Sequence, residues 1–164
     1  MDVMLVSALQ NQFNFERYSA EVYAAMSAGF DHLNLTGMSA YMRKRAEEER
    51  GHAMKFQNFM VDRDIQPYLD LIPAPAMPET GFKFEAGRKL FALALAHERQ
   101  VTARINALYE VANKVVDPAT CVFLHWFISE QVEEEKTLSE ILTRFELAGD
   151  NGAALLLIDR ELGG

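Results

Sequence analysis

The chain has 164 residues, of which 49% are hydrophobic and 24% are charged, the profile of an ordinary soluble globular protein with a substantial core. Its net charge of −8 argues against nucleic acid as a partner and favours cations. Because Cys121 is the only cysteine, neither a disulfide framework nor a multi-thiolate metal site can form within one chain.

The first four residues lack the basic and apolar regions of a signal peptide, and no apolar run is long enough to cross a bilayer. We therefore expect a single cytoplasmic domain over residues 1–164, with neither a membrane nor nucleic acid among its partners.

Two helices are predicted in the first part of the chain. Residues 2 to about 33 hold no proline and keep a helical period, with a buried face formed by Leu5, Leu9, Gln12, Glu16, Ser19, Tyr23, Met26 and Phe30. After a break, for which Thr36 is the expected N-cap, a second helix runs from about 37 to 64. Its buried face is formed by Met42, Arg45, Glu49, His52, Phe56 and Phe59.

The next segment, residues 65–82, contains four closely spaced prolines that forbid a continuous helix: Pro67, Pro73, Pro75 and Pro78. A third helix is predicted over about 83–113. Asp117 and Pro118 are a typical N-cap and first-turn proline for a fourth helix that runs to about 148. A glycine-containing turn then precedes a short fifth helix over about 153–162.

These elements predict an all-α fold. Short connections make the helices of each pair antiparallel, so the proline-rich segment must be a long crossover between helices 2 and 3. The expected architecture is a four-helix bundle over about 2–148, followed by the short fifth helix. Leu155, Leu156, Leu157 and Ile158 of that helix are expected to pack against other subunits.

Polar residues interrupt the buried face of every long helix near its middle. They are Glu16 on the first helix, Glu49 and His52 on the second, Glu98 on the third, and Gln131 and Glu134 on the fourth. The same interval of 33 residues separates Glu16 from Glu49 and Glu98 from Gln131. Buried carboxylates repel one another, and two divalent cations would remove that repulsion. A set of oxygen ligands with one nitrogen suits iron or manganese.

Less specific interpretations exist for each residue alone. A single Glu-x-x-His pattern is usually found on a solvated helix surface, and a buried glutamate usually forms a salt bridge. Four matched positions with a repeated interval favour the metal site.

The motifs Glu16…Tyr23, Glu48-Glu49-x-x-His52, His97-Glu98 and Ser129-Glu130-Gln131-x-Glu133-Glu134-Glu135-Lys136 resemble those of bacterial non-haem ferritins, a family of ferritin-like di-iron bundles. The resemblance covers essentially the whole chain. It implies a ferroxidase centre in which Glu16, Glu49 and His52 bind one iron and Glu49 bridges to the second. Glu98 and Glu134 would hold that second iron, with Gln131 close by.

Further roles follow only from the resemblance. Tyr23 would be a redox-active tyrosine, with Trp126 in a matching aromatic position, although packing alone explains most buried tyrosines. Glu48, Glu130 and Glu133 would form a third iron site; a solvated acidic surface is the alternative. Haem-containing bacterioferritins carry a histidine where this chain has Glu134, so no haem is expected.

The resemblance implies an iron-storage protein that oxidises Fe(II) to Fe(III) with dioxygen or hydrogen peroxide and keeps ferric mineral inside a cage of 24 subunits. One alternative is a rubrerythrin-like di-iron peroxidase, but such proteins usually carry a thiolate iron site that one cysteine cannot build. The other is a non-catalytic shell subunit, which would lack the acids that this chain retains.

Overall fold

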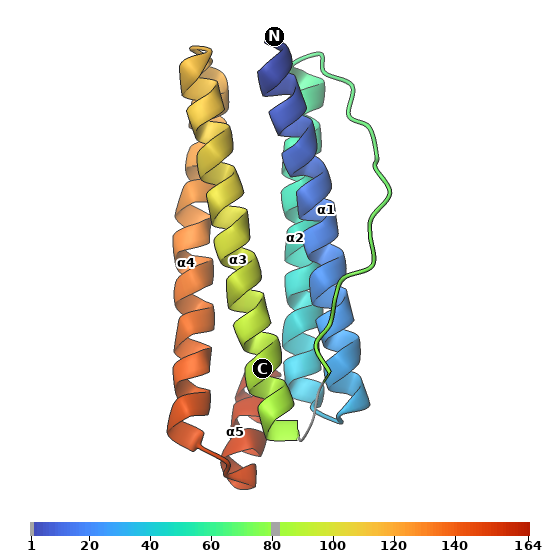
Figure 1. Ribbon diagram of the computed structural model, residues 1–164, viewed down its shortest axis with the longest axis vertical. Helices are drawn as coiled ribbons and strands as arrows, with labels where there is room; N and C mark the ends of the chain where they lie inside the picture. The colour runs from blue at the N-terminus through green and yellow to red at the C-terminus, as the bar shows by residue number, and fades with distance from the viewer. Residues whose placement is uncertain (1, 80–82) are drawn as a thin grey trace.

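The computed structural model of the protein describes residues 2–79 and 83–164 (Figure 1). It contains α1 (Val3–His32), α2 (Thr36–Asp62), α3 (Lys83–Lys114), α4 (Pro118–Ala148) and α5 (Gly152–Leu162). No strand occurs in these two ranges, which confirms the predicted all-α fold. Residues 80–82 of the predicted crossover, and Met1, lie outside the described residues.

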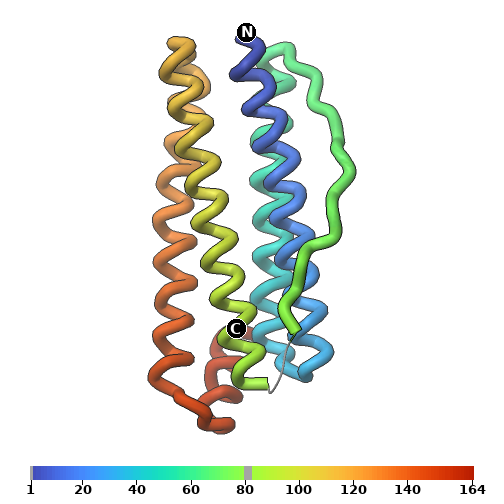
Figure 2. The backbone as a smooth tube through the Cα atoms, in the orientation of Figure 1, coloured from blue at the N-terminus to red at the C-terminus, as the bar shows by residue number. Residues whose placement is uncertain are grey.

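Two antiparallel hairpins, α1/α2 and α3/α4, lie side by side to form the bundle (Figure 1). The crossover runs along the outside of the first hairpin from one end to the other, so that α2 and α3 run in the same direction (Figure 2). Gln10 of α1 holds it there, because its amide donates to the carbonyl of Tyr68 at 2.6 Å and accepts from the Tyr68 N–H at 3.1 Å. Asn14 accepts from the N–H of Asp70 at 3.1 Å.

The N-cap predicted for α4 is confirmed. Asp117 accepts from the N–H of Thr120 at 2.9 Å, and Pro118 is the first helical residue, where its missing N–H removes no hydrogen bond. Asp117 also accepts two bonds from Arg63, at 2.6 and 2.9 Å, which joins the end of α2 to the start of α4.

The N-cap predicted for α2 is wrong. Thr36 is the first residue of the helix, and the capping position belongs to Leu35, whose side chain cannot accept a hydrogen bond. Asp159 of α5 replaces the local cap, since its Oδ1 accepts from the N–H of Met38 at 2.8 Å. Gly37 permits this approach: a Cβ atom there would lie only 1.7 Å from the carbonyl oxygen of Asp159.

Two apolar clusters fill the interior of the bundle. One lies toward the α5 end and includes Tyr23, Met26, Phe30, Met38, Met42, Phe91, Leu138 and Phe145. The other lies toward the N-terminus of α1 and includes Leu5, Leu9, Phe13, Phe56, Ile105, Leu124 and Phe127. The buried faces predicted for the first two helices agree with this core, except that Phe59 is only partly buried. A polar layer at the middle of the helices separates the clusters.

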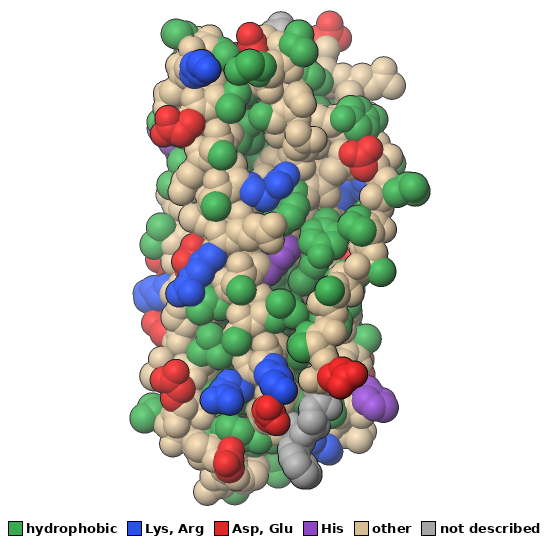
Figure 3. All heavy atoms as spheres, in the orientation of Figure 1, with side chains coloured by type: hydrophobic (Ala, Val, Ile, Leu, Met, Phe, Trp, Pro, Cys, Tyr) green, Lys and Arg blue, Asp and Glu red, His purple; other side chains and the backbone are tan. Residues whose placement is uncertain are grey.

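None of the described helices combines the length and apolar character needed to cross a membrane. Acidic, basic and hydrophobic side chains are interspersed on the face shown in Figure 3.

Candidate metal centre

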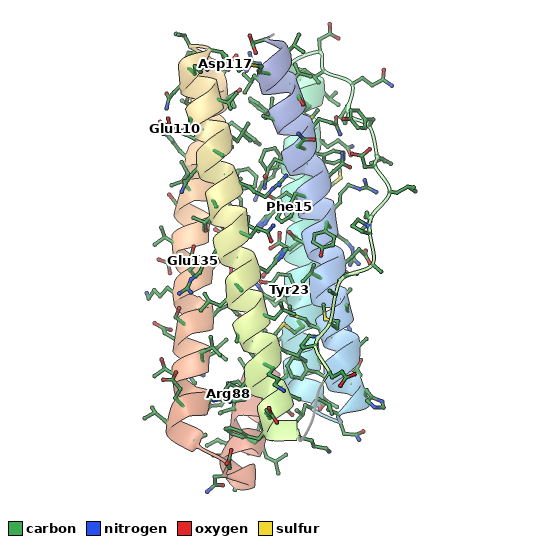
Figure 4. All side chains as sticks on the ribbon, in the orientation of Figure 1. Phe15, Tyr23, Arg88, Glu110, Asp117 and Glu135 are labelled. Atoms are coloured by element: carbon green, nitrogen blue, oxygen red, sulfur yellow. The ribbon has the colours of Figure 1, made fainter. Side chains whose placement is uncertain are left out.

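The polar layer contains the six residues that interrupt the helix faces in the sequence: Glu16, Glu49, His52, Glu98, Gln131 and Glu134. Each is at most 5% exposed. In Figure 4, Phe15 and Tyr23 mark the level of this layer on α1, and Glu135 marks it on α4. Apolar packing on both sides keeps the layer away from bulk water, so charges within it interact strongly.

Glu16, Glu49 and His52 come together as one cluster. Each offers a ligand atom, and these atoms all lie within 4.8 Å of one another. Glu49 and His52 lie on one face of α2 because they are three residues apart, and Nδ1 of His52 lies 3.2 Å from Oε2 of Glu49. Within the described chain no other group of histidine, cysteine or acidic residues meets this criterion.

Glu16 carries one satisfied and one unsatisfied oxygen. The Gln12 amide donates to its Oε1 at 2.7 Å, and Arg104 in turn donates to Gln12 at 3.2 Å. Oε2 of Glu16 is buried without an N–H or O–H donor among the described residues. A buried carboxylate oxygen without a donor is costly, and a bound cation or a proton would remove that cost.

The electrostatics of the cluster favour protons where no cation is bound. Burial, and then the charge of Glu49, raise the pKa of Glu16 well above its ordinary value. Burial and the charge of Glu98 raise the pKa of Glu49 to about 8. Burial lowers the pKa of His52, which keeps its imidazole in the neutral form that binds metals. A divalent cation can therefore exchange with protons held by the two acids.

Glu98 is bound by two neutral donors. The Tyr23 hydroxyl donates to its Oε1, and the Gln131 amide donates to its Oε2 at 2.9 Å. Burial and the charge of Glu98 raise the pKa of Tyr23 well above its ordinary value, so the phenol keeps its proton. The structure thus places Tyr23, Glu98 and Gln131 together, next to the Glu16–Glu49–His52 cluster but outside it.

Glu134 is bound by a cation of the protein itself. Nη2 of Arg45 donates to Oε2 of Glu134, while Nη1 donates to Oε2 of Glu48 at 2.6 Å. The sequence placed Arg45 on the buried face of α2 but gave it no role. A lone arginine among the polar residues of that face was the available signal, yet helix spacing alone does not reveal a partner on α4.

The three flanking acids lie at the edge of the polar layer. The Glu48 side chain is 35% exposed and pairs with Arg45, and Glu133 is exposed with an oxygen 3.8 Å from Lys136. Glu130 is partly buried. Their role as a third iron site stays a prediction, as do the roles of Glu98, Gln131 and Glu134.

Aromatic rings surround the centre. Trp126 lies edge-on to His52 with the ring centroids 5.3 Å apart, and Nζ of Lys55 lies over the Trp126 ring, 3.2 Å from its centroid. His97, which received no ligand role from the sequence, turns away from Glu98 and lies 2.8 Å from the Ser19 hydroxyl.

Known proteins similar to this chain are ferritins. The ferritin-like domain family matches residues 6–148. The bacterial non-heme ferritin of Escherichia coli O6:H1 is 32% identical to this chain, over 96% of this chain and 93% of the relative. The bacterial non-heme ferritin of Staphylococcus epidermidis is 37% identical, over 96% of this chain and 92% of the relative. An open pore ferritin from the archaeon Archaeoglobus fulgidus superposes with a TM-score of 0.94 at 36% identity, covering 99% of this chain and 96% of that one.

Proposed function

The chain belongs to the ferritin family, and on that premise we propose that it stores iron and oxidises Fe(II) to Fe(III) in the polar layer, with dioxygen or hydrogen peroxide as the oxidant. The observation that carries the proposal is the buried cluster of Glu16, Glu49 and His52, whose ligand atoms lie within 4.8 Å of one another. A shell subunit without catalytic activity would not need two carboxylates and an imidazole buried together within reach of one ion.

The donor set suits iron as a substrate. Two carboxylates and a neutral imidazole bind Fe(II), and hard anionic oxygens stabilise Fe(III) more than Fe(II). On binding, the ion replaces protons on Glu16 and Glu49. Each Fe(II) gives up one electron, so two ions supply the two electrons that, with two protons, reduce dioxygen to hydrogen peroxide.

The second Fe(II) is assigned to Glu98 and Glu134, with Glu49 bridging the two ions. Glu98 accepts one hydrogen bond on each oxygen, from Tyr23 and from Gln131, and the remaining lone pairs of these oxygens would bind the ion. Tyr23 would then be a phenol next to the iron pair and a candidate electron donor. The third iron site at Glu48, Glu130 and Glu133 completes the proposed set. A cytoplasmic 24-subunit cage without haem is the assembly in which we expect the mineral to form.

Replacing Glu49 by alanine tests this function. Stopped-flow absorbance after mixing metal-free protein with Fe(II) and oxygen should show loss of the fast oxidation phase in Glu49→Ala, because both ions lose a ligand. Glu47→Ala is the matched control: it removes the same charge two residues away, where Glu47 pairs with Arg50 and its side chain is 66% exposed. We expect wild-type rates from the control. A Glu49→Ala variant that oxidises Fe(II) at the wild-type initial rate would contradict the proposal.

A further inference from the structure

Arg45 is a buried cation inside the layer that is proposed to bind cations. It lies one helical turn before Glu49 on α2 and is 8% exposed. Its two terminal nitrogens bind acids from different helices, Glu48 on α2 and Glu134 on α4. Its Nε is buried without a hydrogen-bond partner among the described residues, and its guanidinium carbon lies 5.7 Å from the centre of the Tyr23 ring.

The two halves of the centre are therefore not equivalent before iron arrives. Among the residues that the structure describes, no Arg or Lys is hydrogen-bonded to the carboxyl group of Glu16 or Glu49, and one oxygen of Glu16 has no hydrogen-bond partner. In the other half, Glu98 is already bound by Tyr23 and Gln131, and Glu134 by Arg45.

We propose that Arg45 is a positioning residue that holds Glu134 in the metal-free protein and thereby makes the two divalent ions bind in order. The first ion binds at Glu16, Glu49 and His52. The second binds only after it displaces the Arg45 guanidinium from Glu134. This inference rests on the proposed function, which assigns the second ion to Glu98 and Glu134.

The neighbourhood of Arg45 supports both states. While Glu134 is buried and without metal, it needs a positive partner, and Arg45 supplies the full charge. Once a divalent ion takes over that role, the guanidinium and the ion repel each other. Glu48 then offers Arg45 a second carboxylate, at 2.6 Å and 35% exposed, on the side that leads to solvent. Arg45 can release Glu134 without becoming an unpaired buried charge.

The cost of that displacement can be measured as a difference between two binding constants. Breaking a charge-assisted hydrogen bond of this kind costs enough free energy to lower the binding constant of the second ion by about tenfold or more. Replacing Arg45 by glutamine keeps the length of the side chain and a donor but removes the charge. The second ion should then bind tighter by about tenfold or more, whereas the first changes little.

The experiment is an anaerobic calorimetric titration of the metal-free protein with Zn(II), which binds oxygen and nitrogen ligands without changing oxidation state. Wild type should show one tight ion per subunit and one weaker ion, and Arg45→Gln should bring the two constants together. Arg43→Gln is the matched control. It removes the same charge from the same helix, but Arg43 is 64% exposed and pairs with Asp31 instead of Glu134. The control should behave as wild type.

An unchanged second constant in Arg45→Gln, or an equal change in Arg43→Gln, would overturn the role of Arg45. If Arg45→Gln fails to fold, Arg45→Met, which also removes the charge and nearly keeps the length of the side chain, takes its place, and an unchanged second constant in that variant would overturn the role equally. A crystal of wild type with one zinc per subunit should show the ion at Glu16, Glu49 and His52, with Arg45 still on Glu134. Zinc found first at Glu98 and Glu134 would reject the order. Failure of the proposed function looks different: Glu49→Ala would then bind as much zinc as wild type.

Discussion

The four buried acids of the polar layer have three kinds of compensation for their charge. Protons compensate Glu16 and Glu49, whose pKa values burial raises. Neutral donors bind Glu98, and a guanidinium binds Glu134. Groups that rely on protons are the easiest to convert into metal ligands, because only a proton leaves. In the proposed order of binding, this difference between neighbouring carboxyl groups decides which pair of acids receives the first ion.

The raised pKa values predict how stability depends on pH in the metal-free protein. The pKa of Glu49 rises to about 8 and that of Glu16 rises well above 4.5, chiefly because of burial, so the folded state holds more protons than the unfolded state. Stability from these groups is present at low pH and is lost as pH rises through the folded pKa. Burial lowers the pKa of His52 and His97 from their ordinary value of 6.5. These two groups therefore make stability rise with pH, but only at pH values below about 6.5.

Above that value the two acids dominate. We expect the melting temperature of the metal-free protein to fall between roughly pH 7 and 8.5, measured by circular dichroism in the presence of a chelator. Glu49→Gln cannot titrate and should flatten this dependence, whereas Glu47→Gln, at an exposed position, should keep it. A melting temperature that rises over the same range, or an unchanged slope in Glu49→Gln, would show that Glu49 carries its charge at neutral pH.

At the scale of the helices, much of the fold could be predicted from the sequence because it depends on local patterns. Apolar periodicity places the five helices with ends within about two residues of those observed, and proline spacing identifies the crossover. The same periodicity puts Glu16, Glu49 and His52 on buried faces. The spacing of Glu49 and His52 puts both on one side of α2.

Contacts between distant segments could not be predicted in this way. The cap of α2 comes from Asp159, far along the chain, so a search for a local capping residue selected Thr36 instead. Arg45 was missed for the same reason, since its partner Glu134 lies on α4. The relative rotation of two helices decides which long side chains meet, and a single sequence does not contain that information directly.

The Arg63–Asp117 contact joins the two hairpins where α2 ends and α4 begins. Asp117 both caps α4 and pairs with Arg63, and these bonds lower the pKa of the Asp117 carboxyl, with Arg63 as the larger cause. Asp117→Ala should therefore lower the free energy of unfolding by roughly 1 to 3 kcal/mol, measured by urea denaturation of the metal-free protein.

The control for the Arg63–Asp117 contact is another arginine–carboxylate ion pair, which is exposed to solvent. Arg144 and Glu161 join α4 to α5 at 3.3 Å, with side chains 49% and 52% exposed. Arg144→Ala should change the free energy of unfolding by less than about 0.5 kcal/mol. Equal effects of the two substitutions would mean that the Asp117 contact is no more than a surface ion pair.

At the scale of the whole molecule, α5 faces two ways. Leu155 and Ile158 are buried in the core of their own subunit, which corrects the expectation that all four apolar residues of this segment pack against other subunits. Leu156 and Leu157 remain exposed, at 64% and 57%. Asp159 meanwhile caps α2. One side of α5 therefore completes the subunit, and the other leaves adjacent apolar side chains exposed to solvent.

This division predicts separable effects on assembly and on folding. Full-length protein should sediment as a 24-subunit cage, and removal of residues 153–164 should both weaken the cage and destabilise the bundle, because Leu155, Ile158 and Asp159 are lost with it. The double variant Leu156→Ser/Leu157→Ser keeps the inner contacts, so it should release smaller species that retain the helical content and melting temperature of a folded subunit. Sedimentation velocity and circular dichroism on the same samples distinguish the two effects.

A double variant that still sediments as the intact cage would show that the exposed side of α5 does not hold subunits together. A full-length monomer or dimer at micromolar concentration would instead favour a small di-iron oxidase over a storage protein.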